Sequence, residues 1–291
     1  MKGLLIYKKE DYLKNTSYAN MLIEYGKLEG LEIQCITFEE ISFGVNEEGL
    51  WLSVNKKPIE EIEFVINRTR ETMLAKQFES MGIRVFNSSE VTYIANHKGR
   101  THQFVSSLGL PALKTLMYYP QYMNVGDLDF DYPLVIKSPD GHGGTEVFKV
   151  ENKEALEDIL SHSKKEEWLI QALCSHVGED VRVFVIGNKI IGAIRRYSKV
   201  DFRANYCLGG QIESYTLSKE EESLVYQLLN HLKCDYVGVD FMIDKDGKFI
   251  FNELEDAVGS RSLYTLNKVD TAKLYIHYIA NEMRLSSNRN F

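Results

Sequence analysis

The chain has 291 residues, of which 44% are hydrophobic, so it can bury a large apolar core divided among two or three subdomains. Its 34 basic and 42 acidic side chains give a net charge of -8, which argues against nucleic acid as a partner. The four cysteines are widely spaced and the N-terminal apolar run is short, so we expect no zinc site, disulfide, signal peptide or membrane span, and a cytoplasmic protein.

Strand and helix patterns alternate in the first third of the chain. Strands are expected at 4–7 and 33–38, with a helix between them that Ser17 caps and Gly30 ends. After an irregular stretch with a hairpin around residue 49, a strand at 64–66, a helix at 71–81 and a strand at 83–86 follow. This alternation predicts a parallel α/β unit over residues 1–88.

Two further regions follow. A helix at 98–108 precedes strands at 114–117, 134–137 and 146–150, which surround a glycine-rich loop and, with the segment 168–172, define a region over 89–172. Longer strands at 180–186 and 189–195 and a helix with a capping box at Ser218 and Glu221 define a third region, 173–291.

The segment 236–255 contains three carboxylates that can converge on one side of a hairpin. Two alternating strands flank an Asp-Gly dipeptide suited to a tight turn. If the loop has two or four residues, Asp240 shares a sheet face with Glu253 and Glu255, whereas an odd loop scatters them. Such a cluster needs a cation, and its oxygen ligands suit Mg²⁺ or Mn²⁺ on nucleotide phosphates. A solvated face paired with lysines would give the same pattern.

Lysines and glycines provide candidate contacts for phosphate. The apolar strand at 134–137 ends in Lys137, and the loop after it contains Gly143 and Gly144, which allow close backbone approach to phosphates. This is not a Walker loop, and alone it is equally typical of a plain connector. Lys98 opens a helix, where the dipole favours an anion, although a surface lysine would fit there as well.

Basic residues also follow the strands of the third region. Arg196 lies at a strand end, and Arg203 and Asn205 precede a glycine pair. Guanidinium groups suit phosphoryl oxygens, although such a stretch alone is also typical of a basic turn.

The order of these features resembles the ATP-grasp superfamily, most closely its RimK-like group of carboxylate–amine (amino-acid) ligases. The likeness covers nearly the whole chain and is most specific at 180–187, 193–196, 201–205 and 237–255. It implies an α/β ATP-grasp fold with an N-terminal parallel α/β subdomain, a central lid subdomain and a C-terminal antiparallel-sheet subdomain.

The resemblance also implies roles for individual residues. Nucleotide contacts would come from Lys98, Lys137, Gly143, Gly144, the backbone of Gln171, Ala172 and Leu173, and Asp180 near the ribose. Catalytic contacts with the transferred phosphate would come from Arg196, Arg203 and Asn205. Asp240, Glu253 and Glu255 would hold the metal, as two Mg²⁺ or Mn²⁺ ions.

Three departures from the family pattern bear on these roles. The hinge has Ala172-Leu173 instead of an acidic residue before an aromatic one. Adenine would therefore be bound only by backbone hydrogen bonds and by the shape of the pocket. Glu255 stands where an asparagine is common and adds negative charge that favours a second ion. Residues 206–208 lack the basic side chains found in relatives, so the sequence does not identify the acceptor substrate.

The implied reaction is phosphorylation of a carboxylate by ATP, followed by attack of an amine, such as an amino acid's, on the acyl phosphate. A small-molecule kinase and a non-catalytic ATP-binding scaffold are the alternatives, and no general base is identified. Arg68 and Arg70 follow a strand and could hold a substrate carboxylate, or simply lie at the surface. The expected partners are a small-molecule acid and amine, with relatives suggesting a homo-oligomer.

Overall fold

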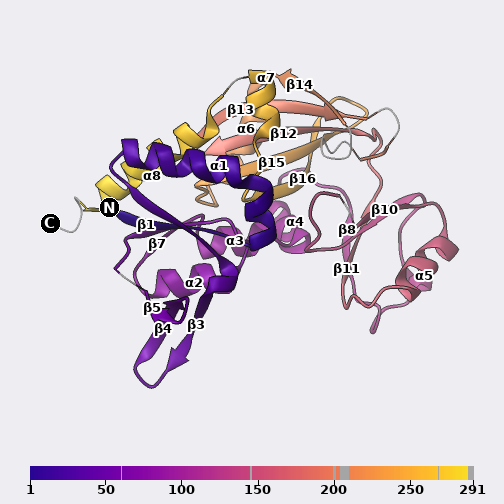
Figure 1. The fold of residues 1–291 in the computed structure, drawn as a ribbon. Helices are drawn as coiled ribbons and strands as arrows, with labels where there is room; N and C mark the ends of the chain where they lie inside the picture. The colour runs from indigo at the N-terminus through magenta and orange to yellow at the C-terminus, as the bar shows by residue number, and fades with distance from the viewer. Residues whose placement is uncertain (60, 145, 199–200, 204–209, 268, 288–291) are drawn as a thin grey trace.

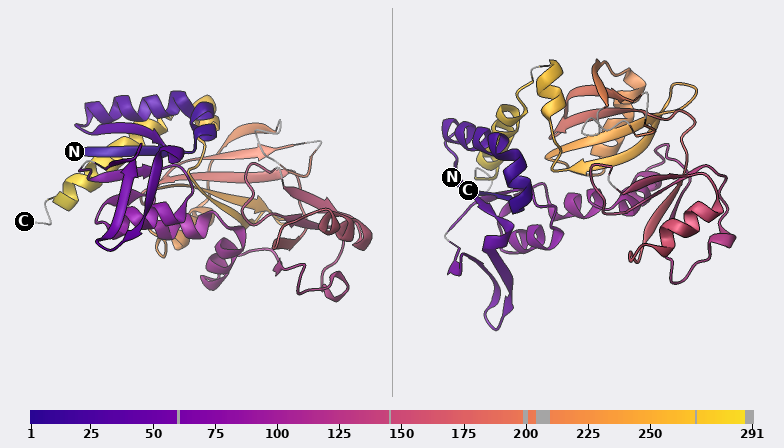
Figure 2. Two further views of the ribbon diagram at one scale, coloured as in Figure 1. Left: turned by 60° about the horizontal axis from the view of Figure 1, so that its bottom comes forward. Right: turned by 45° about the vertical axis from the view of Figure 1, so that its right-hand side comes forward.

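The computed structural model describes residues 1–59, 61–144, 146–198, 201–203, 210–267 and 269–287. It contains a parallel sheet at the N-terminal end and antiparallel sheets in the middle and C-terminal regions (Figures 1 and 2). The C-terminal sheet lies at the top of Figure 1, between the N-terminal region and the middle region on the right. This arrangement confirms the expected α/β class, with a parallel N-terminal sheet and an antiparallel C-terminal sheet.

The N-terminal region is a four-stranded parallel sheet in the order β2-β1-β6-β7. Its elements are β1 (Lys2–Tyr7), α1 (Lys9–Leu28), β2 (Glu32–Thr37), a 3-10 turn η1 (Phe38–Glu40), β6 (Phe64–Asn67), α2 (Thr72–Ser80) and β7 (Arg84–Phe86). The expected hairpin is present as β3 (Ile41–Asn46) and β4 (Gly49–Val54), to which β5 (Lys57–Pro58) adds. The predicted parallel unit is confirmed.

The start of the first helix was predicted wrongly. Helix α1 begins at Lys9, so Ser17 lies inside it and is not its cap. The chain kinks at Asn15, whose side-chain amide donates to the Asp11 carbonyl at 2.7 Å. This bond satisfies a carbonyl of the turn before the kink, so one helical segment ends at Asn15 and a second begins directly after it.

The middle region is a four-stranded antiparallel sheet in the order β10-β9-β11-β8. Its elements are α3 (Ser89–Ala95), α4 (Lys98–Ser107), β8 (Thr115–Tyr118), a 3-10 turn η2 (Val125–Asp127), β9 (Leu134–Lys137), β10 (Val147–Val150), α5 (Lys153–Ser161) and β11 (Trp168–Ala172). The sequence predicted α4 and the strands but not α3 or α5.

The C-terminal region is a five-stranded antiparallel sheet in the order β14-β13-β12-β15-β16. Its elements are β12 (Glu179–Ile186), β13 (Lys189–Tyr197), β14 (Gln211–Tyr215), α6 (Lys219–Leu229), β15 (Tyr236–Ile243), β16 (Phe249–Asp256), α7 (Arg261–Asn267) and α8 (Thr271–Ser287). The predicted capping box opens α6, since Ser218 and Glu221 exchange hydrogen bonds of 2.7 and 3.2 Å.

The last helix returns to the first sheet. Figure 1 shows α8 running beside α1, and its buried Tyr275, Ile276 and Ile279 belong to the same apolar cluster as Leu22 and Phe86. The core of the N-terminal region is therefore completed from the other end of the chain. None of the described helices is long and apolar enough to cross a bilayer.

Asn87, directly after β7, joins the N-terminal and C-terminal regions. Its buried amide accepts from the backbone of Asp235 and Tyr236 at 2.6 and 3.0 Å and donates to the Tyr236 carbonyl and to Asp256 at 2.8 and 2.7 Å. We expect Asn87→Ala to lower the free energy of unfolding by roughly 3 kcal/mol in urea titrations, because it leaves buried backbone groups unpaired. Asn281→Ala, on an exposed helix face, should change it little.

Candidate functional site

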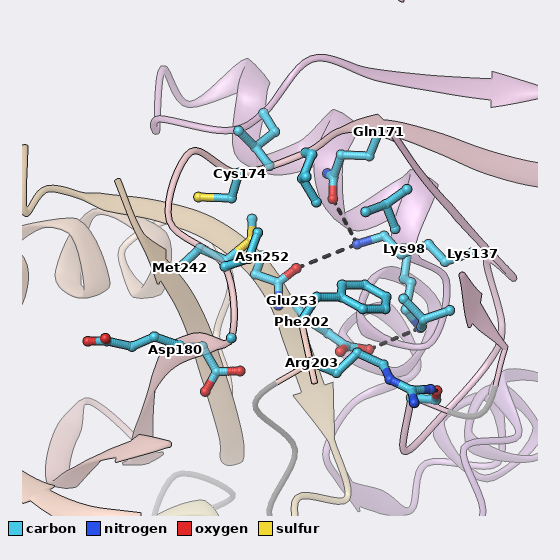
Figure 3. A pocket seen from close by; sticks show the side chains of 18 of the residues that line it. Lys98, Lys137, Gln171, Cys174, Asp180, Phe202, Arg203, Met242, Asn252 and Glu253 are labelled. Atoms are coloured by element: carbon cyan, nitrogen blue, oxygen red, sulfur yellow. Dashed lines mark hydrogen bonds and ion pairs between the residues drawn. The ribbon is translucent and has the colours of Figure 1, made fainter. Parts of the chain in front are cut away.

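A cavity of about 110 Å³ lies between the middle and C-terminal sheets. It contains most of the residues that the sequence predicted to contact a nucleotide: Lys98, Lys137, Gly143, Gly144, Gln171, Ala172, Leu173, Asp180 and Arg203. Glu253, from the acidic hairpin, also lines it. We call this space the nucleotide cavity (Figure 3).

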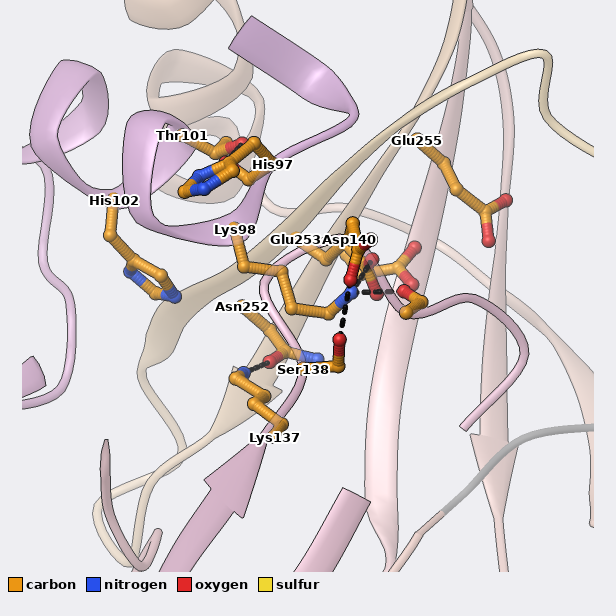
Figure 4. A network of polar contacts seen from close by, with 12 residues as sticks. His97, Lys98, Thr101, His102, Lys137, Ser138, Asp140, Asn252, Glu253 and Glu255 are labelled. Atoms are coloured by element: carbon orange, nitrogen blue, oxygen red, sulfur yellow. Dashed lines mark hydrogen bonds and ion pairs between the residues drawn. The ribbon is translucent and has the colours of Figure 1, made fainter. Parts of the chain in front are cut away.

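Lys98 is buried at the first position of α4, whose cap is the side chain of His97. Its ammonium group lies 3.1 Å from Glu253 Oε1 and also donates to the Gly141 carbonyl (Figure 4). A cation at a helix N-terminus opposes the helix dipole, so its position is favourable only with an anion close by. In this structure Glu253 supplies that anion.

Lys137, the last residue of β9, points into the same cavity (Figure 3). Its ammonium group lies 3.0 Å from Gln171 Oε1 and 3.5 Å from Asn252 Oδ1. The Gln171 amide also donates to Thr115 and contacts buried His102, which fixes its oxygen toward the lysine. Burial and the nearby charge of Lys98 lower the pKa of Lys137 to about 8.

The lowered pKa of Lys137 predicts how nucleotide binding depends on pH. Below about 8 the ammonium group is charged and attracts phosphate, and above that pH it becomes neutral in the ligand-free protein. ATP affinity measured without an acid substrate should therefore fall as the pH rises through about 8. Lys137→Met should bind weakly at every pH and lose this dependence; an unchanged profile in the variant would contradict the assignment.

The hinge after β11 forms the apolar end of the nucleotide cavity. Ala172 and Leu173 line it together with Val135 and Met242. The Ala172 amide already donates to the Lys114 carbonyl at 3.0 Å. A flat apolar ring would therefore be held here mainly by packing, as expected from a hinge without an acidic or aromatic residue.

Asp240, Glu253 and Glu255 share one sheet face, as predicted, but for a different reason. Strand pairing continues to Ile243 and Phe249, which leaves an odd-numbered loop, 244–248, so the condition of a two- or four-residue loop is not met. A β-bulge then shifts the register, leaving Asn252 unpaired and placing Glu253 opposite Asp240. The bulge thus restores the shared face that an odd loop alone would have lost.

The three acids are balanced by cations in this structure. Asp240 accepts three hydrogen bonds of 2.7 Å from Arg182 and Arg196, and these arginines outweigh burial and lower its pKa to about 2. Arg182 also lies 2.6 Å from Glu255. Burial, and then the charges of Asp240 and Glu253, raise the pKa of Glu255 despite Arg182.

The same three acids are the candidate ligands for a divalent cation. Within the described ranges no group of three acidic, histidine or cysteine side chains is already arranged around one point. Asp240, Glu253 and Glu255 nevertheless share a sheet face and influence one another's charge, and each offers the hard oxygen atoms that Mg²⁺ prefers. The donor set fits Mg²⁺, provided that Lys98 and Arg182 turn from the acids toward phosphate.

Arg196 and Asp180 form one buried pair. They lie opposite each other on β13 and β12, with guanidinium–carboxylate distances of 2.5 and 2.7 Å.

Arg182 was not predicted from the sequence, although it lies directly opposite Asp240 across β12 and β15. Its position two residues after Asp180, on the same strand face, was the available signal.

The glycine-rich loop approaches the segment 201–203. Gly143 and Gly144 have φ values of +67° and +76°, which favour glycine. Arg203 donates to the Gly144 carbonyl at 2.7 Å and pairs with Asp201 at 2.7 Å, so it connects the loop to the segment 201–203, which follows β13. Asn205, the remaining predicted catalytic residue, lies outside the described residues.

A second cavity, of about 350 Å³, lies between the N-terminal region and the C-terminal sheet. We call it the arginine cavity, because Arg68, Arg70, Arg182, Arg196 and Arg261 line it, with Tyr7, Asp11, Lys14, Asn15, His142, Gly143, Glu255, Ala257, Gly259 and Ser262. Burial, followed by the charges of Arg70 and Lys98, lowers the pKa of His142 to about 4, so its ring is neutral near neutral pH. Gly143 lines both cavities, so they meet at the glycine-rich loop.

Comparisons with known proteins agree with this geometry. A family model described as the RimK-like ATP-grasp domain matches residues 95–279. A probable alpha-L-glutamate ligase of Vibrio vulnificus is 29% identical over 228 residues, covering 75% of this chain and 74% of that protein. Beta-citrylglutamate synthase B of Homo sapiens is 26% identical over 272 residues, covering 87% and 70%.

A solved structure, the RimK domain protein ATP-grasp from Sphaerobacter thermophilus, superposes with a TM-score of 0.74 at 18% sequence identity. The match covers 96% of this chain and 99% of the other. At that identity the likeness shows a shared fold over nearly the whole chain.

Proposed function

The chain belongs to the RimK-like ATP-grasp family of ATP-dependent carboxylate–amine ligases, and on this basis we propose which of its residues act. ATP occupies the nucleotide cavity, with its phosphates between Lys98 and Lys137 under the glycine-rich loop. Adenine packs at the Ala172–Leu173 hinge. Two buried lysines that line one cavity support this orientation. Glu253 balances Lys98, but Lys137 has no described carboxylate within ion-pair distance, so its buried charge favours an anion there.

Asp240, Glu253 and Glu255 hold Mg²⁺ beside the phosphates. When bound there, Mg²⁺ would supply positive charge that offsets the charge of the phosphate oxygens. We propose two ions, because a third carboxylate, Glu255, adds negative charge at a position where relatives commonly carry an amide. Lys98 and Arg182, released from these acids, then face the phosphate oxygens.

The observation that carries the substrate assignment is the contact of the two cavities at Gly143. An acid in the arginine cavity can there reach the terminal phosphate of ATP. Its carboxylate oxygen attacks phosphorus, ADP leaves, and an acyl phosphate forms. An amine then attacks the acyl carbon, inorganic phosphate leaves, and Arg196 and Arg203 stabilise the oxygen charge in both steps.

The amine is proposed to be an amino acid or a peptide. The names of both curated relatives refer to glutamate as a component that is joined. A cytoplasmic location and a homo-oligomeric state stay predictions from the sequence.

Product analysis tests this function. The protein, Mg²⁺ and ATP are incubated with pooled acids and amines, and ADP, phosphate and new amides are measured. We expect ADP release to require an acid and the amide to require both substrates. ADP formed with a hydroxyl compound alone, and a phosphorylated product, would instead identify a kinase.

A further inference from the structure

Arg68 differs from the other well-buried arginines of the arginine cavity. Arg182 and Arg196 are each held by two carboxylates, and the half-buried Arg70 lies 3.3 Å from Asp11. The guanidinium of Arg68 has no carboxylate within ion-pair distance among the described residues, although the side chain is only 7% exposed. The protein thus buries one positive charge beside the cavity without a counter-ion from the described chain.

The surroundings of Arg68 offset this charge only in part. One amino group donates to the carbonyls of Ala257 and Val258 at 3.0 and 3.1 Å, while Nε makes no hydrogen bond. The guanidinium lies 5.8 and 5.6 Å from the ring centres of Tyr7 and Tyr18. Ring faces attract a cation only weakly. The described residues therefore offset only part of the free-energy cost of removing the Arg68 charge from water.

Tyr7 adds a second unmatched group at the same place. Its buried hydroxyl lies close to Arg68 but makes no hydrogen bond of normal geometry, and the residue lines the arginine cavity with Arg68. Burial raises the pKa of Tyr7, so the phenol keeps its proton and can donate. A buried guanidinium whose Nε makes no hydrogen bond and a buried hydroxyl without an acceptor are complementary to an anionic ligand.

We propose that Arg68 and Tyr7 bind a second carboxylate of the acid substrate, so that the enzyme selects dicarboxylic acids. This inference rests on the proposed ligase function. The carboxylate that is phosphorylated lies toward Gly143, near Arg182 and Arg196, and the second carboxylate is held against the N-terminal region. An acid without that second group leaves Arg68 unpaired, which penalises its binding and reaction.

The test replaces the unknown amine with hydroxylamine, which traps an acyl phosphate as a hydroxamate and so reports on the acid alone. Acids are compared in matched pairs that differ by one carboxylate, glutarate against pentanoate and succinate against butanoate. For the wild-type protein we expect kcat/KM to favour the dicarboxylate by about 10²-fold or more. Arg68→Met should reduce this preference to near unity and leave KM for ATP unchanged.

Two further variants separate recognition from folding. Tyr7→Phe removes only the hydroxyl and should raise KM for the dicarboxylate by roughly 10-fold without changing turnover of the monocarboxylate. Arg284→Met, on the outer face of α8, should keep the full preference. If Arg68→Met does not fold, Tyr7→Phe alone must show the selective change in KM.

The outcomes distinguish this site from the function on which it rests. Equal turnover of both members of each pair by the wild type, or an equal loss of both in Arg68→Met, would overturn the dicarboxylate site while the ligase stands. No ADP or hydroxamate with any acid would count against the ligase. The site would then be decided by melting temperature, which glutarate but not pentanoate must raise in the wild type and not in Arg68→Met.

Discussion

Replacing Glu253 with glutamine should reduce ADP formation by roughly 10²- to 10³-fold, because the change removes a charge proposed to act on both the metal and Lys98. The Glu253 carboxylate lies 3.1 Å from the Lys98 ammonium group and opposite Asp240 on the paired strand. Glutamine keeps the size of the side chain but offers a weaker metal ligand and no charge. Turnover is measured as ADP release at saturating ATP and Mg²⁺.

Asp246→Asn provides the matched control for Glu253→Gln. Asp246 is an exposed acid in the turn of the same hairpin, far along the strands from the bulge, so the same loss of charge there should leave ADP release unchanged. Melting temperatures of both variants show whether each remains folded. A Glu253→Gln protein that is folded and keeps wild-type turnover would remove Glu253 from the proposed metal site.

The second large effect concerns stability and the neighbouring residues Arg196 and Arg195. Arg196 is 5% exposed and pairs with Asp180 and Asp240. The side chain of Arg195 is 37% exposed and pairs with Glu179 and Glu213. Arg196→Met should lower the free energy of unfolding by about 3–5 kcal/mol, because it leaves buried carboxylates without a counter-ion. Arg195→Met should cost about 0–1 kcal/mol, because solvent reaches the Arg195 side chain and Glu179 keeps a contact with His176.

The pH dependence of Arg196→Met provides an independent check. In the wild type the arginines hold the pKa of Asp240 near 2, below its value in the unfolded chain. The ionised acid therefore stabilises the fold at pH values above the unfolded pKa, and this stabilisation is lost as the pH falls toward 2. In the variant, protonation relieves the unpaired charge. The stability difference should therefore shrink as the pH falls. A difference independent of pH would mean that lost packing, and not charge, dominates.

Periodicity and local signals were sufficient for much of the fold. The alternation of strand and helix in residues 1–88 specified a parallel sheet, and the Ser218–Glu221 capping box marked the start of α6. These features depend on contacts between residues close in sequence, which a local pattern records. Ser17 was wrongly taken as the cap of α1, because a helical segment from Lys9 precedes the kink at Asn15 and a second segment follows it directly.

The sequence by itself determined the residue types of the site: two lysines, a glycine-rich loop, arginines and three acids in a fixed order. Only the tertiary structure decided how their charges combine. The bulge at Asn252 sets the register of the hairpin, Arg182 pairs with Asp240 across separate strands, and Arg68 is buried apart from any described carboxylate. The physical reason is that burial and pairing depend on residues distant in the chain, so the charge that each group feels appears only when the sheets pack together.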